Sequence, residues 1–581
     1  MRQFSILNLW FNARMRYLLR MSMYRKSDQF LRGLRVFLGF MIIFNMNLFA
    51  QWQTRSPYAI TEDSAPHRKC GFPFMLEAYF SANRELYEHL QLFKMTSTQF
   101  DSVTFSPSGR FKIYYQVEGI HAIPDYDRDL NGTPDYLEFV GRSFDRAWQI
   151  EIDSLGFNPP RDSSGYFREI YPVYCRLLRD YGITILDYEI PSLPEFNFVT
   201  YTEININYDF INYPGVTDPI VRDSMAIAIT AAHEFNHASH SGYRIWTENN
   251  DVLDLWFIES SATYMEEVVS PEVNDYVQYL DYYFQRTNQP LDQSSGGLED
   301  YGKVVLEIML GERYFPQIMR YTWEKILEYR ALPALDNVLQ SLQTSFSAEF
   351  SLLSAWLYFT NERSVSGRYF PDGELFPSPR FKAAVAVQER KTVLINDSLP
   401  GNSFQWYFSS LEIDSALQLY LRALKGSVAS DLNATLIPPP GIEFIQFPAS
   451  ISTPIEIASS QTAMPFGIVN SNMNSGNFYH FEMISNPINP VSSTDIRVFP
   501  QPFLLSNSQE YLQFDQVPEN ANLSIFNSQG NHIITLTGNP GTQRVIWDLK
   551  NSQGNRVGSG VYMYYVNSPE IQYQGKFVVI Y

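Results

Sequence analysis

The chain has 581 residues, of which 45% are hydrophobic and 15% aromatic, which excludes a disordered protein and suits roughly two to four domains with buried cores. Eight Lys or Arg and one Asp lie in the first 50 residues, so the net charge of −19 leaves about −26 on the remainder. This acidic body argues against binding to nucleic acid or to anionic membranes and is compatible with an exported protein.

Residues 36–49 form an apolar run that follows several Lys and Arg residues and precedes Ala50, as in a secretory signal peptide. We therefore assign residues 1–50 to a signal peptide, although the basic region is long and a start at Met21 or Met23 gives it the usual length. A membrane anchor is the alternative, but the run is short for a hydrocarbon core of about 30 Å. We expect a secreted or surface protein with no stable membrane span after cleavage.

Residues 76–93 place apolar side chains at helical spacing, shortly after the first of two cysteines, Cys70. In an exported chain Cys70 and Cys175 are able to pair, but a large core does not require a disulfide, so both states remain open. Because other metal ligands are available, we do not expect a cysteine metal site. The sequence also leaves open whether the segment before Cys70 is an inhibitory pro-region.

An acidic loop follows the alternating strand that is predicted for residues 110–117. Its spacing matches the calcium loop of an EF-hand, with Gly132 at the sharp turn and a glutamate at the end. The oxygen donors are Asp127, Asp129, Asn131, Thr133, Asp135 and Glu138. We expect a structural Ca²⁺ ion here, and the alternative is an acidic turn that caps the helix predicted to follow.

An H-E-x-x-H motif lies further along, with Glu234 between His233 and His237. On a helix this spacing puts both imidazoles on one face, where they bind one zinc ion, while the glutamate addresses a metal-bound water molecule. Thr217 or Asp218 is suited to cap the start of that helix. The motif predicts a zinc-dependent hydrolase with Glu234 as general base.

A catalytic zinc ion usually takes three protein ligands and leaves the fourth position to water. Glu259 is the candidate third ligand, because its E-x-x-A segment on the next predicted helix resembles that of gluzincin metallopeptidases. In the metzincin class of zinc peptidases the third ligand would instead be a histidine six residues after His237. Tyr243 occupies that position in this chain. His240 faces the same side as the ligands but is displaced about 10 Å along the axis, so we expect it to line the cleft or the surface.

Three further side chains are candidates for supporting roles around the zinc ion. Glu266 lies on the same helix face as Glu259, where it would orient a ligand histidine, and a solvated acidic face is the equal alternative. Tyr264 and Tyr301 are candidate hydrogen-bond donors to an oxyanion on the substrate. Because the chain has 38 tyrosines, simple core packing is the alternative for each.

The sequence pattern changes near residue 391, where helical periodicity gives way to alternating runs and to stretches rich in Pro, Ser and Asn. This pattern predicts a β-sandwich-like accessory domain over residues 391–490. Residues 496–581 contain alternating runs between glycine-containing turns, as in a small antiparallel sandwich of the Ig-like kind.

Three stretches together resemble a family of secreted gluzincin-type metalloproteases from gliding and related bacteria. They are the acidic loop, the H-E-x-x-H helix and the segment around Glu259, and the resemblance covers residues 68–360. It implies His233, His237 and Glu259 as zinc ligands and Glu234 as general base. Asn236 departs from the family, in which bulky or aromatic residues are common at this position, and would alter the cleft.

The resemblance implies a multidomain fold class, with an α+β zincin-like metalloprotease domain at residues 51–390 followed by one or two all-β sandwich domains. In zincin folds an edge strand binds extended substrate, and residues 197–208 are the candidate, with an ordinary core strand as the alternative. Residues 547–566 resemble Ig-like domains akin to the flagellar hook-cap protein, which serve as type IX secretion sorting signals in Bacteroidetes. That likeness implies contact with export machinery.

We therefore expect a secreted zinc endopeptidase that acts on a protein or peptide substrate. One alternative is a catalytically inactive binding or structural protein of the cell surface on the same fold. Another is a hydrolase of non-peptide amides or esters.

Overall fold

The computed structural model describes residues 68–80, 99–190, 197–294, 297–388, 395–412, 417–423, 431–437, 443–457, 463–477, 479–487, 496–504, 511–518, 520–538, 544–568 and 572–581. The predicted signal peptide and most of the helix predicted for residues 76–93 lie outside these ranges. Within these ranges, no helix is long and apolar enough to cross a membrane.

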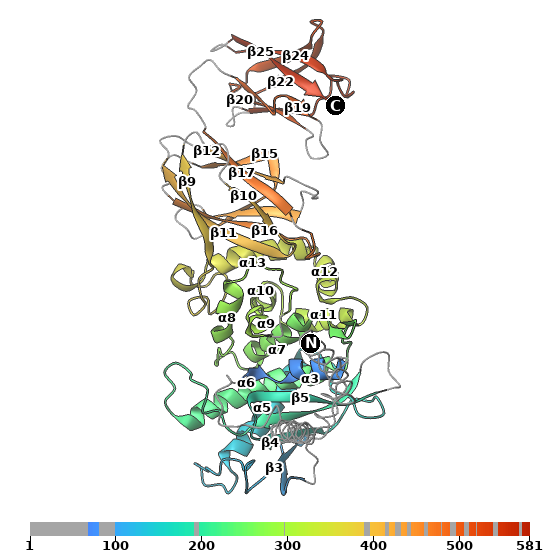
Figure 1. Ribbon diagram of the computed structural model, residues 1–581, viewed down its shortest axis with the longest axis vertical. Coiled ribbons are helices and arrows are strands. Elements are labelled where there is room, and N and C mark those ends of the chain that lie inside the picture. The colour runs from blue at the N-terminus through green and yellow to red at the C-terminus, as the bar shows by residue number, and fades with distance from the viewer. Residues whose placement is uncertain are drawn as a thin grey trace, which may run out of the picture.

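A six-stranded sheet forms the base of the molecule as drawn in Figure 1. Its strands are β1 (Arg68–Cys70), β2 (Ser102–Phe105), β3 (Phe111–Tyr115), β4 (Tyr171–Arg176), β5 (Asp180–Glu189) and β6 (Phe198–Asn205). They lie in the order β1-β5-β6-β4-β3-β2, and β3, β4 and β6 are mutually parallel. Strand β5 runs antiparallel to β6, while β1 pairs in parallel with β5 at the end of the sheet.

Residues 197–208 do not form an edge strand, because β6 lies between β4 and β5. Every residue of β6 is buried, as expected for a strand that is hydrogen-bonded on both sides and covered by helices. The alternative interpretation of this segment as an ordinary core strand is therefore confirmed.

Helices α5 (Asp135–Ala147) and α6 (Pro219–His240) lie side by side, and α6 packs on β5 and β6. Helix α5 begins at the end of the acidic loop and continues as a π-helical segment, η2 (Trp148–Ser154). Its apolar face enters a core shared with β3, β4 and α6, which explains why an amphipathic sequence follows the loop.

A layer of helices lies between this sheet and the all-β part of the chain (Figure 1). It comprises α7 (Leu255–Val269), α8 (Val277–Phe284), α9 (Leu298–Gly302), α10 (Val305–Arg313), α11 (Ile318–Ile326), α12 (Ala331–Ser341) and α13 (Phe346–Tyr358). Helix α7 packs against α6, and the short α3 (Phe72–Phe80) joins the same hydrophobic core.

Two sheets form the first all-β unit, in the orders β14-β13-β16-β11-β9 and β10-β17-β12-β15. The strands are β9 (Phe381–Gln388), β10 (Ile395–Leu399), β11 (Ser403–Glu412), β12 (Leu417–Ala423), β13 (Leu432–Leu436), β14 (Ile445–Pro448), β15 (Ser450–Ile457), β16 (Ala463–Asn470) and β17 (Tyr479–Pro487). Because β9 belongs to the first sheet, the all-β part begins before residue 391. Trp406 of β11 packs on Tyr358 of α13, so this unit shares the helical core.

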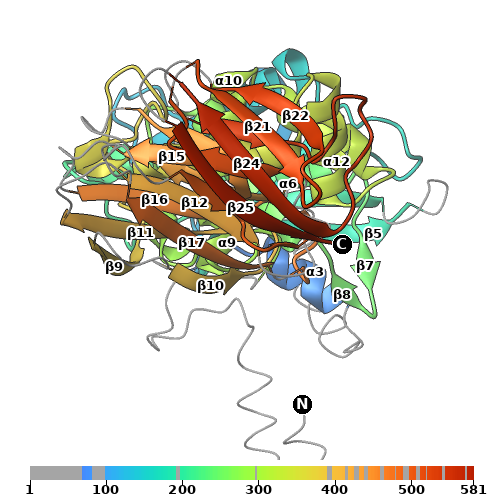
Figure 2. The same ribbon diagram turned by 90° about the horizontal axis from the view of Figure 1, so that it is seen from above.

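The C-terminal unit has two sheets, β18-β20-β23 and β19-β25-β24-β21-β22, around a hydrophobic core of its own. The strands are β18 (Arg497–Phe499), β19 (Phe503–Leu504), β20 (Leu512–Asp515), β21 (Asn522–Asn527), β22 (His532–Thr537), β23 (Arg544–Trp547), β24 (Gly560–Asn567) and β25 (Gln572–Ile580). Figure 2 shows this unit, in red, in front of the other layers. The chain is thus a multidomain protein with a mixed α/β part and two β-rich parts.

Candidate metal centre

The H-E-x-x-H segment lies in the last turns of α6, where the sequence predicts it. The helix begins after Asp218, whose carboxylate accepts a hydrogen bond from the backbone N–H of Ile220 at 3.0 Å. Gly182 of β5 lets this helix approach the sheet, because a Cβ atom there would lie 2.7 Å from Thr230 Cγ2 and 2.9 Å from Glu234 Cγ. Sequence reasoning did not single out Gly182.

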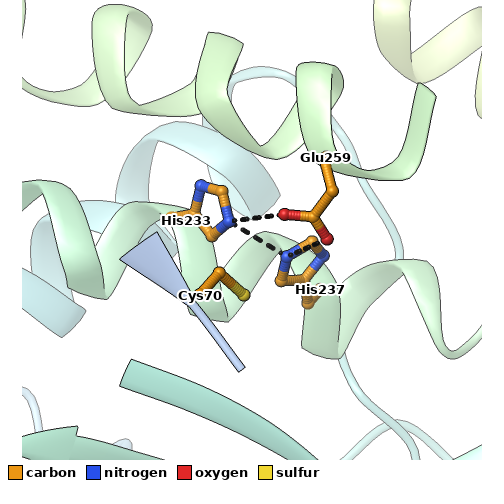
Figure 3. Close-up of side chains that lie close together, drawn as sticks. All are labelled: Cys70, His233, His237 and Glu259. Atoms are coloured by element: carbon orange, nitrogen blue, oxygen red, sulfur yellow. Dashed lines mark hydrogen bonds and ion pairs between the residues drawn. The ribbon is translucent and has the colours of Figure 1, made fainter. Parts of the chain in front are cut away.

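The predicted ligands His233, His237 and Glu259 converge between α6 and α7 (Figure 3). The two Nε2 atoms lie 3.1 Å apart. Each is 3.4 Å from an oxygen of Glu259, the first from Oε2 and the second from Oε1. Two imidazoles at i and i+4 and a carboxylate from the next helix therefore share one small volume.

The chemistry of this donor set fits a zinc ion. All three side chains are buried, and neither oxygen of Glu259 accepts a hydrogen bond of ordinary geometry within the described residues. Burial, followed by the negative charge of Glu234, raises the pKa of Glu259, and burial lowers the pKa of both imidazoles. A cation that accepts nitrogen and oxygen ligands would offset the cost of burying these groups.

Glu234 points toward β5 and lies beside the ligands. The hydroxyl of Thr184 is 2.9 Å from its Oε2 atom. Burial raises the pKa of Glu234 to about 8, and hydrogen bonds from Cys70 and Thr184 partly oppose that rise. A carboxylate with a pKa near neutrality is suited to exchange protons.

Glu266 orients one of the ligand histidines, which is the first of the two roles that the sequence suggested for it. Its Oε1 atom lies 2.7 Å from Nδ1 of His233, and its Oε2 atom accepts a hydrogen bond from Lys69 at 2.8 Å. Lys69 also pairs with Asp275, and all these side chains are buried. The alternative of a solvated acidic face is therefore wrong.

Cys70 is a fourth potential ligand, which was not expected from the sequence. The ligand atoms of Cys70, His233, His237 and Glu259 all lie within 4.8 Å of one another. Strand pairing between β1 and β5, which no local pattern reveals, brings the thiol to the centre. Cys175 lies buried on β4 in a different core, and both cysteines are unpaired, so no disulfide links them.

The structure places only one of the two candidate tyrosines at the centre. The ring of Tyr301 lies 6.0 Å from that of His233, and the nearby Tyr301 hydroxyl partly opposes the rise in the pKa of Glu259 that burial causes. The hydroxyl of Tyr264 instead lies against Gly311 of α10, where a Cβ atom would be only 2.0 Å away. Tyr264 fills the core between α7 and α10, so its proposed role as oxyanion donor was wrong.

His240 and Asn236 also differ from expectation. His240 is buried and stacks on Trp323 with ring centroids 3.8 Å apart, so it lies in the core and not on the surface. Asn236 faces away from the ligands and donates a hydrogen bond to Glu151 of η2 at 2.9 Å. The departure at Asn236 is therefore matched by a buried carboxyl group behind α6.

The acidic loop brings part of its predicted ligand set together. Carboxylate oxygens of Asp127, Asp129 and Asp135 lie within 4.8 Å of one another. The amide of Asn131 donates to Glu138 at 2.8 Å, which draws the end of the loop toward its middle. No side-chain contact of Thr133 with this cluster is seen in the described residues, which suits a position that binds through its carbonyl oxygen.

Comparison with known proteins assigns no family, because no family model and no curated protein matches the chain. Among solved structures, PorZ of the Porphyromonas gingivalis type IX secretion system aligns at 19% identity over 19% of this chain and 15% of that chain, with a TM-score of 0.14. Latent PorU from the same organism aligns at 16% identity over 29% and 18%, with a TM-score of 0.13. The adhesin domain of Epf from Streptococcus pyogenes aligns at 10% identity over 32% and 77%, with a TM-score of 0.12. Scores this low assign neither fold nor function.

Proposed function

We propose that this chain is a zinc-dependent peptidase. The observation that carries the proposal is the convergence of His233, His237 and Glu259 around one point, with both carboxylate oxygens buried and without ordinary hydrogen bonds. Three protein ligands with a glutamate beside them are typical of a catalytic zinc site.

The fold around these ligands supports the proposal. A sheet with β3, β4 and β6 parallel and β5 antiparallel packs on the ligand-bearing helix α6, and α7 supplies the third ligand from the other side. This arrangement resembles a zincin-like domain of the gluzincin type. Because unrelated functions share folds, the proposal depends on the ligands and on Glu234.

Each residue then has a defined role in peptide hydrolysis. A zinc ion held by the three ligands would supply Lewis-acid polarisation of the scissile carbonyl and lower the pKa of water. Glu234 takes a proton from the attacking water and delivers it to the leaving amine. Tyr301 donates a hydrogen bond to the developing oxyanion.

The proposal is tested by the substitution Glu234→Gln, with measurement of both bound zinc and cleavage of an unfolded protein substrate. Because Cys70 also lies at the centre, we make the change in the natural chain and in a Cys70→Ser chain. The expected result is one zinc per chain throughout and cleavage that falls by roughly 10²- to 10⁴-fold in the Glu234→Gln variants.

Zinc binding without cleavage in either background would instead favour a binding or structural protein. Cleavage of esters or non-peptide amides alone would favour the other hydrolase class. Cleavage that survives the substitution at Glu234 would refute the assignment of that residue as the general base.

We also propose that residues 127–138 hold a structural Ca²⁺ ion and that residues 496–581 act as a sorting signal for a secretion machinery. The first rests on the clustered carboxylates of Asp127, Asp129 and Asp135. The second rests on the separate core of the C-terminal unit, which suits an independently recognised module. Surface delivery of a reporter carrying this unit, in a host with type IX secretion, tests the second proposal.

A further inference from the structure

We propose that Cys70 is a fourth ligand of the metal and that the segment of residues 69–72, named here the latch, keeps the site in a latent form. This inference rests on the proposed function, which it extends to the regulation of the same site. It follows from the positions of the latch residues relative to the ligands.

The thiol of Cys70 adds a fourth donor atom to the three predicted ligands. Its sulfur lies with the ligand atoms of His233, His237 and Glu259 within 4.8 Å, and Figure 3 shows the side chain reaching the histidines from β1. A zinc site with four protein ligands has no position for water or substrate, whereas a catalytic site keeps one position open. A thiolate is also a strong zinc ligand.

The backbone around Cys70 is suited to a sulfur ligand. The N–H group of Phe72 donates a hydrogen bond to Cys70 Sγ at 3.2 Å, which partly opposes the rise in the pKa of the thiol that burial causes. The intervening Gly71 donates to the carbonyl of Gly182 at 3.1 Å. A Cβ atom on Gly71 would lie 2.7 Å from Ile183, so only glycine lets the latch approach β5 this closely.

The latch side chains contact either a ligand of the metal centre or the carboxylate that orients one of the ligands. Lys69 donates to Glu266, the residue that orients His233. The ring of Phe72 stacks on His237, with centroids 4.3 Å apart and an interplanar angle of 21°. The latch thus contacts His237 directly and reaches His233 through Glu266, and its sulfur lies within 4.8 Å of a ligand nitrogen of each histidine.

The latch also covers the edge of the sheet beside the metal centre. Strand β1 pairs with β5, with Arg68 opposite Asp180 and Cys70 opposite Gly182. Strand β5 is otherwise the last strand of the sheet on this side. An uncovered β5 would offer main-chain donors and acceptors to an extended peptide beside the metal. Latch and substrate therefore compete for the same edge.

Activation of the latent form exchanges one ligand. As the latch leaves β5, Cys70 would release the metal and take up a proton from solvent as a thiol, and a water molecule would take its place among the ligands. No oxidant or reductant is consumed.

The ligand is identified by replacing zinc with Co²⁺ and recording the near-ultraviolet absorption spectrum. A thiolate bound to Co²⁺ produces an intense charge-transfer band. We expect this band in the natural chain and in a Cys175→Ser control, since Cys175 lies in a different core, and its loss in Cys70→Ser. Absence of the band from the natural chain would overturn the inference, and that measurement does not depend on any variant folding.

Latency is tested by peptide cleavage in the same three zinc-loaded proteins. We expect Cys70→Ser to cleave at least roughly tenfold faster than the natural chain and the Cys175→Ser control, because it removes a tethered competitor. Equal cleavage in all three would overturn the latch while leaving the peptidase proposal intact. A thiolate band without cleavage by any protein would instead refute the peptidase and, with it, the latch, leaving a closed structural site.

Discussion

Nδ1 of His233 lies 2.7 Å from Oε1 of Glu266, so a carboxylate on α7 holds an imidazole that α6 presents to the metal centre. With its proton on Nδ1, the imidazole donates to Glu266 and keeps the Nε2 lone pair for a metal ion. Lys69 pairs with the other oxygen of Glu266, so the latch and the ligand histidine are connected through one buried carboxylate.

The first prediction concerns this carboxylate. Replacing Glu266 with Ala leaves His233 without its orienting partner, and we expect zinc affinity to fall by roughly 10- to 100-fold. Competition with a chromophoric chelator measures the affinity. Glu267→Ala is the matched control, because Glu267 is the next residue on α7 and has no contact with either histidine among the described residues. Equal losses in both variants would show that helix stability, not orientation, is responsible.

The second prediction separates the two tyrosines. Tyr301→Phe removes a hydroxyl at the centre, and we expect kcat to fall by about 10²-fold while bound zinc is unchanged. Tyr264→Phe removes a hydroxyl that lies against α10, and we expect kcat to change by less than about twofold. Steady-state kinetics on a peptide, in the Cys70→Ser background, provide the comparison. A larger loss with Tyr264→Phe would reverse the assignment.

The third prediction concerns the acidic loop. Millimolar Ca²⁺ is expected to raise the melting temperature of the chain, because an ion bound about 100-fold above its Kd contributes roughly 3 kcal/mol. Replacing both Asp127 and Asp129 with Asn removes this response, whereas Asp125→Asn, just before the loop, preserves it. Calorimetry with Ca²⁺ and with Mg²⁺ makes the test. If Ca²⁺ raised the melting temperature equally in both variants, the loop would be an acidic turn without a bound ion.

The fourth prediction concerns the effect of Glu307, on α10, on how the free energy of unfolding depends on pH. This buried carboxyl accepts a hydrogen bond from Ser260 at 2.6 Å, and burial raises its pKa from the ordinary 4.5 to about 7. The folded state therefore binds the proton more tightly than the unfolded state. The contribution of this proton to the free energy of unfolding is fully present below the pKa of Glu307 in the unfolded chain. It is lost as the pH rises through the pKa of Glu307 in the folded chain.

We expect the free energy of unfolding to decrease by up to about 3 kcal/mol between pH 4 and pH 8 through this group, and Glu307→Gln to abolish that component. Denaturant unfolding at both pH values measures the difference between the variant and the natural chain. Glu312→Gln, an exposed position on the same helix, is the control. An identical pH dependence in all three proteins would contradict the raised pKa.

Local patterns accounted for much of the site. The spacing of His233 and His237, the cap at Asp218 and the amphipathic α5 all act over a few residues, where helix geometry decides which side chains share a face. Glu259 was reached through a resemblance, and α7 brings it to the histidines.

The sequence alone thus determined the helix that bears the two histidines, the acidic loop before it and the change to β-structure, although β9 begins that part before residue 391. Tertiary structure decided which distant groups surround the ligands. Lys69 and Glu266 are 197 positions apart, and only the pairing of β1 with β5 brings the latch and Cys70 to the histidines. Sheet pairing and helix packing depend on the whole core, so no local period in the chain distinguishes Tyr301 from Tyr264 or reveals that β6 is an interior strand.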